Sequence, residues 1–258
     1  MRLKDKVVIV TGSTTGVGEA IARMCVAEGA RVIVHGRNEQ AARNLVAALG
    51  GAAAMCCGNL ADPQTPDKIV KSAIAAFGRL DALVNNAADT SRSNIQTTSA
   101  ELFDRIIATN LRAPLLLIQA TLPHLTQSRG AVLNIGSVNA YCGSPSLLAY
   151  SISKGGLMTL TRNLADALAD EHVRVNCVNL GWVLTANENK LMISEGLSPD
   201  WANHPPRDPC PSGRLIRPEE VAQLAVYWVS DDSRPVSGTV MDFHQRPVIG
   251  RNPPKDIA

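Results

Sequence analysis

The sequence has 258 residues, and its 25 Lys and Arg against 23 Asp and Glu give a formal net charge of +2. A chain of this length can bury a large core, and one α/β domain commonly fills it, so we expect a single domain over residues 1–258. No run of like charge makes a basic face for phosphodiester or anionic lipid, so nucleic acid and membrane surfaces are not expected partners.

The cysteines and the N-terminus point to the cytoplasm, and the histidines give no sign of a metal site. The six cysteines have no regular spacing, which is typical of reduced thiols in a cytosolic protein. The five histidines lack the short spacings of metal sites, so no metal is expected. The first apolar run, 7–10, is too short for a signal peptide, and no apolar stretch approaches the roughly 18 residues of a membrane-spanning helix.

Short apolar runs alternate along the chain with stretches of helical periodicity, which predicts βαβ units. Strands are expected at 7–10, 32–34, 82–84, 131–135, 173–178 and about 238–242, with a further strand ending at Cys56-Cys57. Helices are expected at 17–29, 38–48, 64–77, 100–126, 148–169 and 218–230. The fold class is therefore α/β, with a doubly wound parallel sheet of the Rossmann type.

Residues 186–217 interrupt this alternation. They contain five prolines and two glycines, so we expect no long regular element there. We interpret the segment as a mobile lid beside the active site, within the single domain.

A glycine-containing loop, Thr11-Gly12-Ser13-Thr14-Thr15-Gly16-Val17-Gly18, joins the first expected strand to the first expected helix. Glycines let the backbone approach a pyrophosphate, and the helix N-terminus favours its charge. The spacing differs from the Gly-x-Gly-x-x-Gly of the general fingerprint, so a simple tight turn is the alternative for the loop taken alone. We expect a dinucleotide to bind through Gly12, Thr14, Thr15, Gly16, Val17 and Gly18.

The second expected strand ends at His35-Gly36-Arg37-Asn38, without the carboxylate that binds the adenosine ribose in NAD sites. Arg37 instead offers bidentate, charge-assisted hydrogen bonds to a 2′-phosphate. A solvated arginine at the start of a helix is the alternative. Gly36 and Arg37 together predict NADP (NADPH) as the cofactor in preference to NAD, with Asn38 also at the cofactor site.

Tyr150 and Lys154 stand four residues apart at the start of an expected helix, so both side chains project from one face. We expect the cation, together with the positive ring of an oxidised nicotinamide, to lower the pKa of the phenol from about 10 towards the range of a general base. A Tyr and a Lys so spaced are otherwise ordinary residues of a helix surface.

Other polar and small residues fall where strands end. Ser137 follows the strand over 131–135, at the sheet edge where ligands of such folds bind, although a turn or cap serine is the alternative. Asn110 lies within the helical stretch 100–126. Asn85-Asn86-Ala87-Ala88 ends the strand over 82–84, where small residues let the backbone pass close to a flat cofactor.

Together these motifs resemble the short-chain dehydrogenase/reductase family of the single-domain, Tyr-x-x-x-Lys type. The resemblance covers about residues 5–245 and rests on motifs in family order and spacing: Thr11 to Gly18, Asn85 to Ala88, Asn110, Ser137, Tyr150 with Lys154, and Val178 to Thr185. It implies an enzyme that transfers a hydride between nicotinamide and a small alcohol or carbonyl substrate.

The resemblance also implies roles for single residues. Ser137 holds the substrate oxygen, Tyr150 exchanges a proton with it, and Lys154 binds the nicotinamide ribose while tuning Tyr150. Asn110 keeps a water in a relay to solvent. Further cofactor contacts are implied at Asn86, Ala87 and Ala88 for the adenosine ribose, at Asn59 and Leu60 for adenine, and at Gly181, Val183 and Thr185 around the nicotinamide.

Three residues depart from the family pattern, and none removes a catalytic group. Asn59 replaces the usual Asp, and its carbonyl can still accept a hydrogen bond from the adenine amino group. Ala88 replaces the final Gly of Asn-Asn-Ala-Gly. Leu180 replaces the Pro before Gly181, which loosens the φ restraint on that turn.

The expected substrate contacts are Ser137, Asn139, Tyr150 and Asn187. The lid residues Asn187, Glu188, Asn189, Lys190 and Asn203 favour a sugar, a sugar acid or a polyol over a steroid or long acyl chain. A β-ketoacyl thioester reductase is the alternative. A dinucleotide-sensing regulator without chemistry is the alternative of another class, but a sensor needs no proton donor.

Assembly is implied only by the resemblance, which suggests a homotetramer or a homodimer formed through the helices over 100–126 and 148–169 and through C-terminal segments. The tail after Gly238, which runs through Pro253-Pro254, is Pro-rich and long enough to cover a neighbouring subunit.

Overall fold

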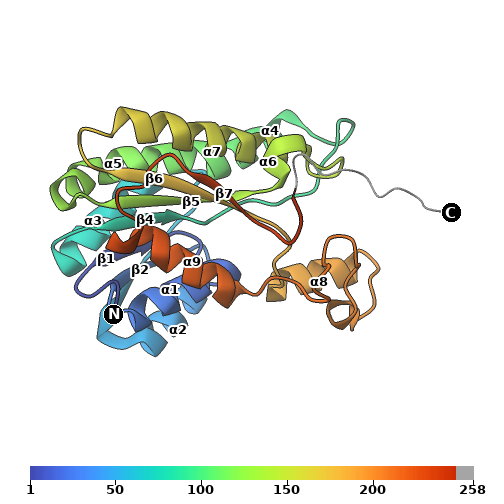
Figure 1. The fold of residues 1–258 in the computed structure, drawn as a ribbon, viewed down its shortest axis with the longest axis horizontal. Helices are drawn as coiled ribbons and strands as arrows, with labels where there is room; N and C mark the ends of the chain where they lie inside the picture. The colour runs from blue at the N-terminus through green and yellow to red at the C-terminus, as the bar shows by residue number, and fades with distance from the viewer. Residues whose placement is uncertain (248–258) are drawn as a thin grey trace.

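Seven parallel strands form one sheet, in the order β3-β2-β1-β4-β5-β6-β7, in the computed structural model, which describes residues 1–247 (Figure 1). The end of the Pro-rich tail, with Pro253-Pro254, lies outside the described residues. The strands are β1 (Val7–Val10), β2 (Arg31–Gly36), β3 (Ala53–Cys57), β4 (Ala82–Asn85), β5 (Ala131–Ser137), β6 (Arg174–Leu180) and β7 (Val240–Phe243). The strand order reverses between β1 and β4, and the doubly wound parallel sheet is confirmed.

The central strands are buried on both faces because helices cover both sides of the sheet. Every residue of β1, β4, β5 and β6 is buried. In β1, Val8 pairs with Val32 of β2 on one side and with Ala82 of β4 on the other. Such nearly continuous apolar runs are typical of parallel strands covered by helices.

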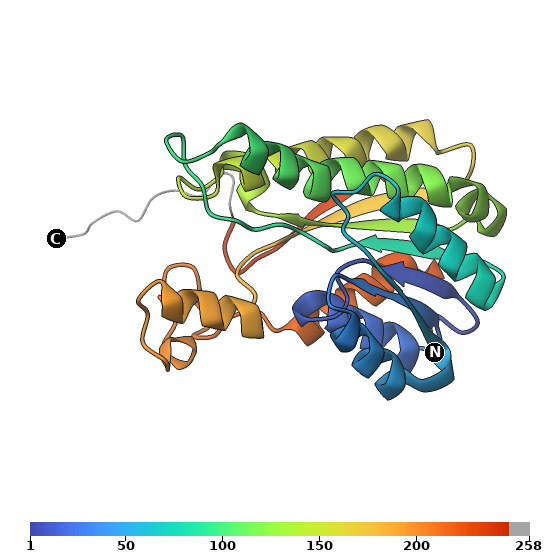
Figure 2. The same cartoon turned by 180° about the vertical axis from the view of Figure 1, so that it is seen from behind.

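Two hydrophobic cores lie on the two faces of the sheet. The helices α1 (Gly16–Ala27), α2 (Glu39–Leu49) and α9 (Pro218–Val229) pack on one face. The helices α3 (Thr65–Phe77), α5 (Ala113–Ser128) and α7 (Leu148–Ala167) pack on the other, as Figures 1 and 2 show. Each of these helices begins and ends within two residues of the range expected from the sequence, with one exception. The single helix expected over 100–126 is divided into two, α4 (Ala100–Ile107) and α5.

A π-helical turn divides that stretch. It covers Ala108–Arg112, between α4 (Ala100–Ile107) and α5. The continuous periodicity of 100–126 gave no sign of it. π-helical turns often occur at functional sites because they redirect one side chain, and here the turn contains Asn110.

The stretch Ala100–Ser128 is also the one helix among the described residues long and apolar enough, by length and composition alone, to cross a membrane. The sequence has no uninterrupted apolar run of that length, in agreement with the expectation. This helix reaches its mean hydropathy of 1.2 with polar residues between the apolar ones. Leu117, Ile118 and Leu125 from α5 are buried in the core against the sheet. A core helix passes the same test of length and composition.

The segment 186–217 forms a small lobe at the carboxyl edge of the sheet (Figure 2). It begins with α8 (Ala186–Ser194), a helix that the prolines do not interrupt because the first of them is Pro199. The lobe has its own apolar cluster, which includes Met192, Trp201, Cys210 and Leu215. A bridge between Val183 and Ile216 joins its two ends. The lobe is therefore more regular than the sequence predicted.

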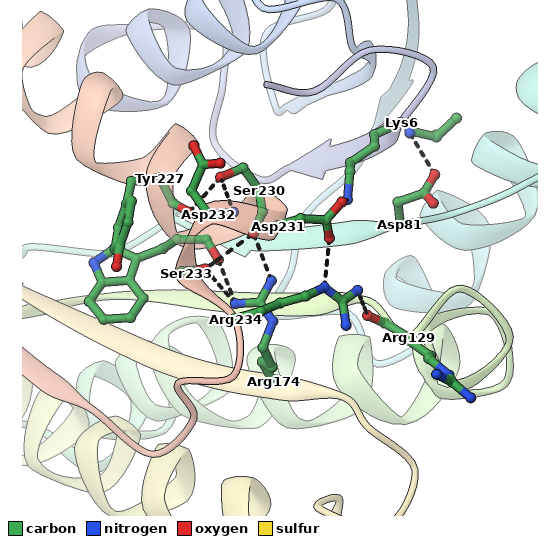
Figure 3. A network of polar contacts seen from close by, with 12 residues as sticks. Lys6, Asp81, Arg129, Arg174, Tyr227, Ser230, Asp231, Asp232, Ser233 and Arg234 are labelled. Atoms are coloured by element: carbon green, nitrogen blue, oxygen red, sulfur yellow. Dashed lines mark hydrogen bonds and ion pairs between the residues drawn. The ribbon is translucent and has the colours of Figure 1, made fainter. Parts of the chain in front are cut away.

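At the opposite edge of the sheet, Arg174 fixes the turn after α9 (Figure 3). The residue is only 5% exposed, and its guanidinium donates to the Ser233 hydroxyl at 2.5 Å and to the carbonyls of Ser230 and Trp228 at 2.9 and 3.2 Å. Asp231, in the same turn, forms ion pairs with Lys6 and with Arg234. This network aligns β6 and α9 far from the carboxyl edge.

Candidate active site

Thr11 joins the glycine loop to the end of β4. Its hydroxyl accepts hydrogen bonds from the backbone N–H groups of Asn86 and Ala87, at 3.0 and 3.1 Å. The Asn86 side-chain amide donates back to the Thr11 carbonyl at 2.8 Å. These two N–H groups, in the stretch expected to face the adenosine ribose, are thus used within the protein, and only the remaining backbone of residues 86–88 is available to a ligand.

The glycine loop has the shape that a pyrophosphate needs. Gly12 has φ of 63°, and a Cβ there would lie 2.8 Å from the Cα of Ala87, so only glycine fits. Thr15 caps α1 without a side-chain hydrogen bond, which leaves the first N–H groups of the helix open to an anion. Val17 is partly buried and packs against the core. The loop over 12–18 fits a dinucleotide.

The end of β2 lies directly behind this loop. The buried imidazole of His35 accepts a hydrogen bond from the Gly12 N–H at 3.4 Å, and burial lowers the pKa of His35 to about 4, so the ring is neutral. A Cβ on Gly36 would lie 2.5 Å from the Thr14 hydroxyl, so no carboxylate can occupy position 36 without moving Thr14. Gly36 and the Thr14 side chain thus pack closely at the end of β2.

Arg37 is exposed, and within residues 1–247 its guanidinium makes no hydrogen bond or ion pair. The next residue, Asn38, is already engaged, because its side-chain oxygen accepts from the Ala41 N–H at 3.0 Å and caps α2. The Arg37 side chain is thus uncommitted within the described residues, whereas Asn38 retains only its amide N–H donors and a second oxygen lone pair for a ligand.

The two residues expected near adenine differ in exposure. Asn59 is exposed, and its side-chain oxygen accepts a hydrogen bond from the Ala61 N–H at 3.1 Å, with a second lone pair left for a ligand. Leu60 is 5% exposed and belongs to the core between the sheet and α3. Leu60 can thus reach adenine only through its backbone.

The amide of Asn110 joins three segments of the chain. Its oxygen accepts from the Asp89 N–H at 2.7 Å, and its nitrogen donates to the Asp89 carbonyl at 2.9 Å and to the Ser153 hydroxyl at 3.0 Å. Ser153 in turn donates to the Tyr150 carbonyl at 2.6 Å. The sequence implied a water-holding role for Asn110, and the structure adds a direct one, because its amide fixes the first turn of α7.

Lys154 is buried, at 2% exposure, and its ammonium donates to the Ile135 carbonyl at 2.8 Å. Its other two N–H donors make no hydrogen bond within the described residues, which leaves them open to a ribose hydroxyl. Burial lowers the pKa of Lys154 to about 8. The ammonium lies 5.6 Å from the centre of the Tyr150 ring, on the same helix face, as the spacing predicts.

The electrostatics of Tyr150 correct one expectation. Burial raises the pKa of the phenol above its ordinary value, the Ser137 hydroxyl opposes this, and the Glu188 carboxylate raises it further. We expected Lys154 to lower this pKa, but Lys154 is not among the groups that shift it. Within the protein alone the phenol is therefore held protonated, ready to donate. Ser137 and Tyr150 are brought together at the carboxyl edge, as predicted.

The chain after β6 passes beside the glycine loop. Gly181 donates to the Phe243 carbonyl at 3.0 Å, and a Cβ there would lie 2.1 Å from the His244 ring, so a larger residue would have to displace that ring. Leu180, where the family has Pro, remains part of β6 and pairs with Phe243. Val183 is buried, and the Thr185 methyl lies 3.2 Å from the position of a Cβ on Gly16. Thr185 is thus next to the expected nicotinamide end.

The residues expected to touch substrate lie on both sides of Tyr150. Asn139 begins the short helix α6 (Asn139–Cys142) and donates its N–H to the Ser137 hydroxyl at 3.2 Å. Asn187 is exposed in the first turn of α8. An open groove of about 810 Å³ is lined by Asn139 and neighbours from α6 and α7, but neither Ser137 nor Tyr150 lines it, so we do not place the reacting atoms there.

Four side chains at the site were not assigned a role from the sequence. They are Thr11, which joins two loops, His35 behind the glycine loop, Trp182, whose indole N–H donates to Glu188 at 2.8 Å, and Arg92, which makes a two-point ion pair with Glu195 at the end of α8. Thr11, His35 and Trp182 lie within stretches that the sequence analysis singled out, whereas no sequence signal marked Arg92. No group of three or more His, Cys, Asp or Glu side chains within residues 1–247 could hold a metal ion.

Fold and site together define a class: an α/β protein with a dinucleotide loop at the strand-order reversal and a Ser, Tyr and Lys set at the same sheet edge. The family model described as short chain dehydrogenase matches residues 6–195. The chain therefore belongs to the short-chain dehydrogenase/reductase family, and it is an oxidoreductase that binds a nicotinamide cofactor.

Individual relatives resemble the chain over nearly its whole length. A 3-oxoacyl-(acyl-carrier-protein) reductase from Thermotoga maritima is 32% identical over 93% of this chain and 97% of its own. An L-rhamnose 1-dehydrogenase (NAD(P)(+)) from Azotobacter vinelandii is 34% identical over 92% and 94%. The crystal structure of a 3-ketoacyl-(acyl-carrier-protein) reductase from Brucella melitensis complexed with NADH has a TM-score of 0.84 and 28% identity, covering 93% and 97%.

Proposed function

We propose that the protein is an NADP-dependent oxidoreductase that acts on a small alcohol or carbonyl compound, with Tyr150 as its acid/base. The observation that carries this proposal is the position of Tyr150 at the carboxyl edge of the sheet, between Ser137 and the buried Lys154, on the edge that also holds the glycine loop. Ligands of doubly wound folds bind at this edge.

The chain's own residues then have distinct tasks. Ser137 holds the substrate oxygen, and Tyr150 gives it a proton in reduction or takes one in oxidation. Lys154 directs its free N–H donors towards a ribose, and Asn110 fixes α7 through Ser153. When bound, the nicotinamide supplies or accepts the hydride. The positive charge of its oxidised form favours the phenolate, which the protein alone does not.

Selectivity for NADP rests on Arg37 and Gly36. Within residues 1–247 the exposed guanidinium has no protein partner and matches a 2′-phosphate, and a carboxylate at position 36, where NAD sites hold the ribose, would have to displace the Thr14 side chain. The NADH in the Brucella structure belongs to that protein and does not decide the preference of this chain.

The substrate class we favour is polyhydroxylated: a sugar, a sugar acid or a polyol. The segment 186–217, which we propose to be the lid, presents polar side chains, and one relative is a rhamnose dehydrogenase. A β-ketoacyl thioester reductase is the second candidate, and two other relatives carry that activity in their names. We further propose one domain over 1–258, a cytoplasmic location, and a homotetramer or homodimer.

A cofactor and substrate screen tests the proposal. The protein is mixed with NADPH and a panel of small carbonyl compounds, then with NADP and a panel of sugars and polyols, and absorbance of the reduced nicotinamide is followed. We expect turnover in at least one panel, faster with NADP(H) than with NAD(H). Binding of NADPH without turnover of any compound would support a dinucleotide sensor instead.

A further inference from the structure

Glu188 is held in a fixed position in the first turn of α8, one residue after Asn187. Its backbone N–H donates to the Thr185 hydroxyl at 3.0 Å, and Thr185 is the residue that lies beside Gly16. Its Oε1 accepts a hydrogen bond from the indole N–H of Trp182 at 2.8 Å. Trp182 itself stacks on Trp201, with ring centres 5.1 Å apart. The position of the carboxylate is thus fixed by a hydrogen bond to an indole that is itself stacked on a second indole.

The orientation of Glu188 leaves it open to a ligand. Within the described residues, Oε2 accepts no hydrogen bond, and no Lys or Arg forms an ion pair with this carboxylate. Two nearby carboxylates differ: Glu195 at the end of α8 pairs with Arg92, and Glu220 at the start of α9 pairs with Arg214. Of these three carboxylates, Glu188 is the one without an ion pair in the part of the chain that the structure describes.

The charge of Glu188 reaches the reacting centre. It acts on the Tyr150 phenol, whose pKa it raises in addition to the larger effect of burial. A group that disfavours negative charge on the phenol also disfavours negative charge on a substrate bound against it.

From this placement we propose that Glu188 selects the substrate by charge: its free oxygen accepts a hydrogen bond from a hydroxyl of a neutral, polyhydroxylated substrate, and its charge rejects anionic substrates. The inference rests on the proposed function and narrows it, because it retains sugars and polyols and removes sugar acids. It adds no chemical step, since the proton and hydride transfers are those already assigned.

Matched pairs of compounds that differ by one negative charge test the inference. We would compare kcat/KM for an aldose with that for its aldonic acid, and for the methyl ester of a 3-oxo acid with that for the free acid, using NADP or NADPH. The wild-type protein should prefer the neutral member by about tenfold or more. Because the effect is electrostatic, this ratio should shrink as the salt concentration rises.

Glu188→Gln keeps the size of the side chain and its acceptor for Trp182 but removes the charge. We expect kcat/KM for the anionic members to rise about fivefold to tenfold, while that for the neutral members changes less than about threefold. Glu188→Leu, which also removes the acceptor, should lower turnover of the neutral members. Glu171→Gln removes the same charge from an exposed turn before β6 and should leave every ratio unchanged.

The possible results distinguish a failure of the role proposed for Glu188 from a failure of the proposed oxidoreductase function. Wild-type turnover that shows no preference for neutral substrates, or a ratio that neither Glu188→Gln nor salt alters, overturns the role of Glu188 and leaves the proposed function intact. The salt series needs no variant, so the test stands even if a substitution impairs folding. If wild-type protein that binds NADPH turns over no member of any pair, the proposed function fails, and the inference with it.

Discussion

The ammonium of Lys154 donates a hydrogen bond to the carbonyl oxygen of Ile135 at 2.8 Å, two residues before Ser137 on the same strand. This contact fixes α7 against β5, and so sets Tyr150 relative to Ser137. It also keeps a cation buried with one hydrogen-bond partner among the described residues, which costs folding free energy because a buried charge loses its water. The site is thus assembled at some expense of stability.

Replacing Lys154 with Met should therefore stabilise the protein while abolishing turnover. At pH 7 we expect the free energy of unfolding of Lys154→Met to exceed that of the wild type by about 1–2 kcal/mol, since the methionine fills the space without a charge. Urea denaturation of both proteins measures this. A variant less stable than the wild type would show that the buried ammonium contributes net stability.

The same substitution predicts a pH dependence of stability. The pKa of Lys154 falls from 10.5 to about 8 on folding, so the unfolded chain binds this proton more tightly than the folded protein. The group's unfavourable contribution is complete below about pH 8 and disappears as pH rises towards 10.5, an effect of at most roughly 3 kcal/mol. The stability advantage of Lys154→Met should shrink from pH 7 to pH 10. An advantage that is equal at both pH values would contradict the burial of the charge.

Arg37 provides a test of cofactor choice. Arg37→Ala removes a cation at the end of β2 that has no partner within residues 1–247, and we expect the Kd for NADPH to rise about tenfold to a hundredfold while that for NADH changes little. Fluorescence titration gives both constants. Arg31→Ala, on the same strand but far from the loop, serves as the matched control. An equal loss of affinity for both cofactors would refute a specific contact with the 2′-phosphate.

Arg92 and Glu195 connect the loop after β4 to the end of α8, through hydrogen bonds of 2.8 and 3.2 Å. Both side chains are partly exposed, so the pair contributes no more than about 1 kcal/mol. That energy would favour the closed position of the proposed lid, 186–217, and would still let it open. Arg92→Ala should raise the KM for substrate about twofold to fivefold, most clearly at low salt, with global stability unchanged. Arg2→Ala breaks a remote pair and should have no such effect. If both variants behave like the wild type, 186–217 is not held over the site by this pair.

The network around Arg174 should matter for stability and not for chemistry. Arg174→Ala leaves the buried carbonyls of Ser230 and Trp228 without their donor, and we expect a loss of about 2–4 kcal/mol in the free energy of unfolding. The variant that remains folded should keep its kcat, because Arg174 lies at the edge of the sheet opposite Tyr150. A marked fall in kcat with unchanged stability would place this network in the catalytic cycle.

The sheet and its main helices could be predicted because their signals are local. Val7 to Val10 are apolar in a row since both faces are covered, and Pro218 with two carboxylates marks the start of α9 within its own turn. The Tyr150 and Lys154 pair could be found for the same reason, since a spacing of four on a helix is independent of the rest of the chain.

The features that could not be predicted depend on distant contacts. The π-helical turn at Asn110 is fixed by Asp89 and Ser153, which are 21 and 43 residues away. The pKa of Tyr150 depends on burial and on Glu188, which no spacing rule connects to it. The helix α8 was obscured by the prolines that follow it, although none lies within it.

The central claim is that Tyr150 exchanges the proton of the substrate, and Tyr150→Phe tests it most directly. The substitution keeps the ring against Lys154 and removes only the hydroxyl. Turnover with NADPH should fall by about 100-fold or more while NADPH binds as tightly as before. Turnover equal to that of the wild type, in a variant that binds NADPH normally, would show that the proton comes from elsewhere.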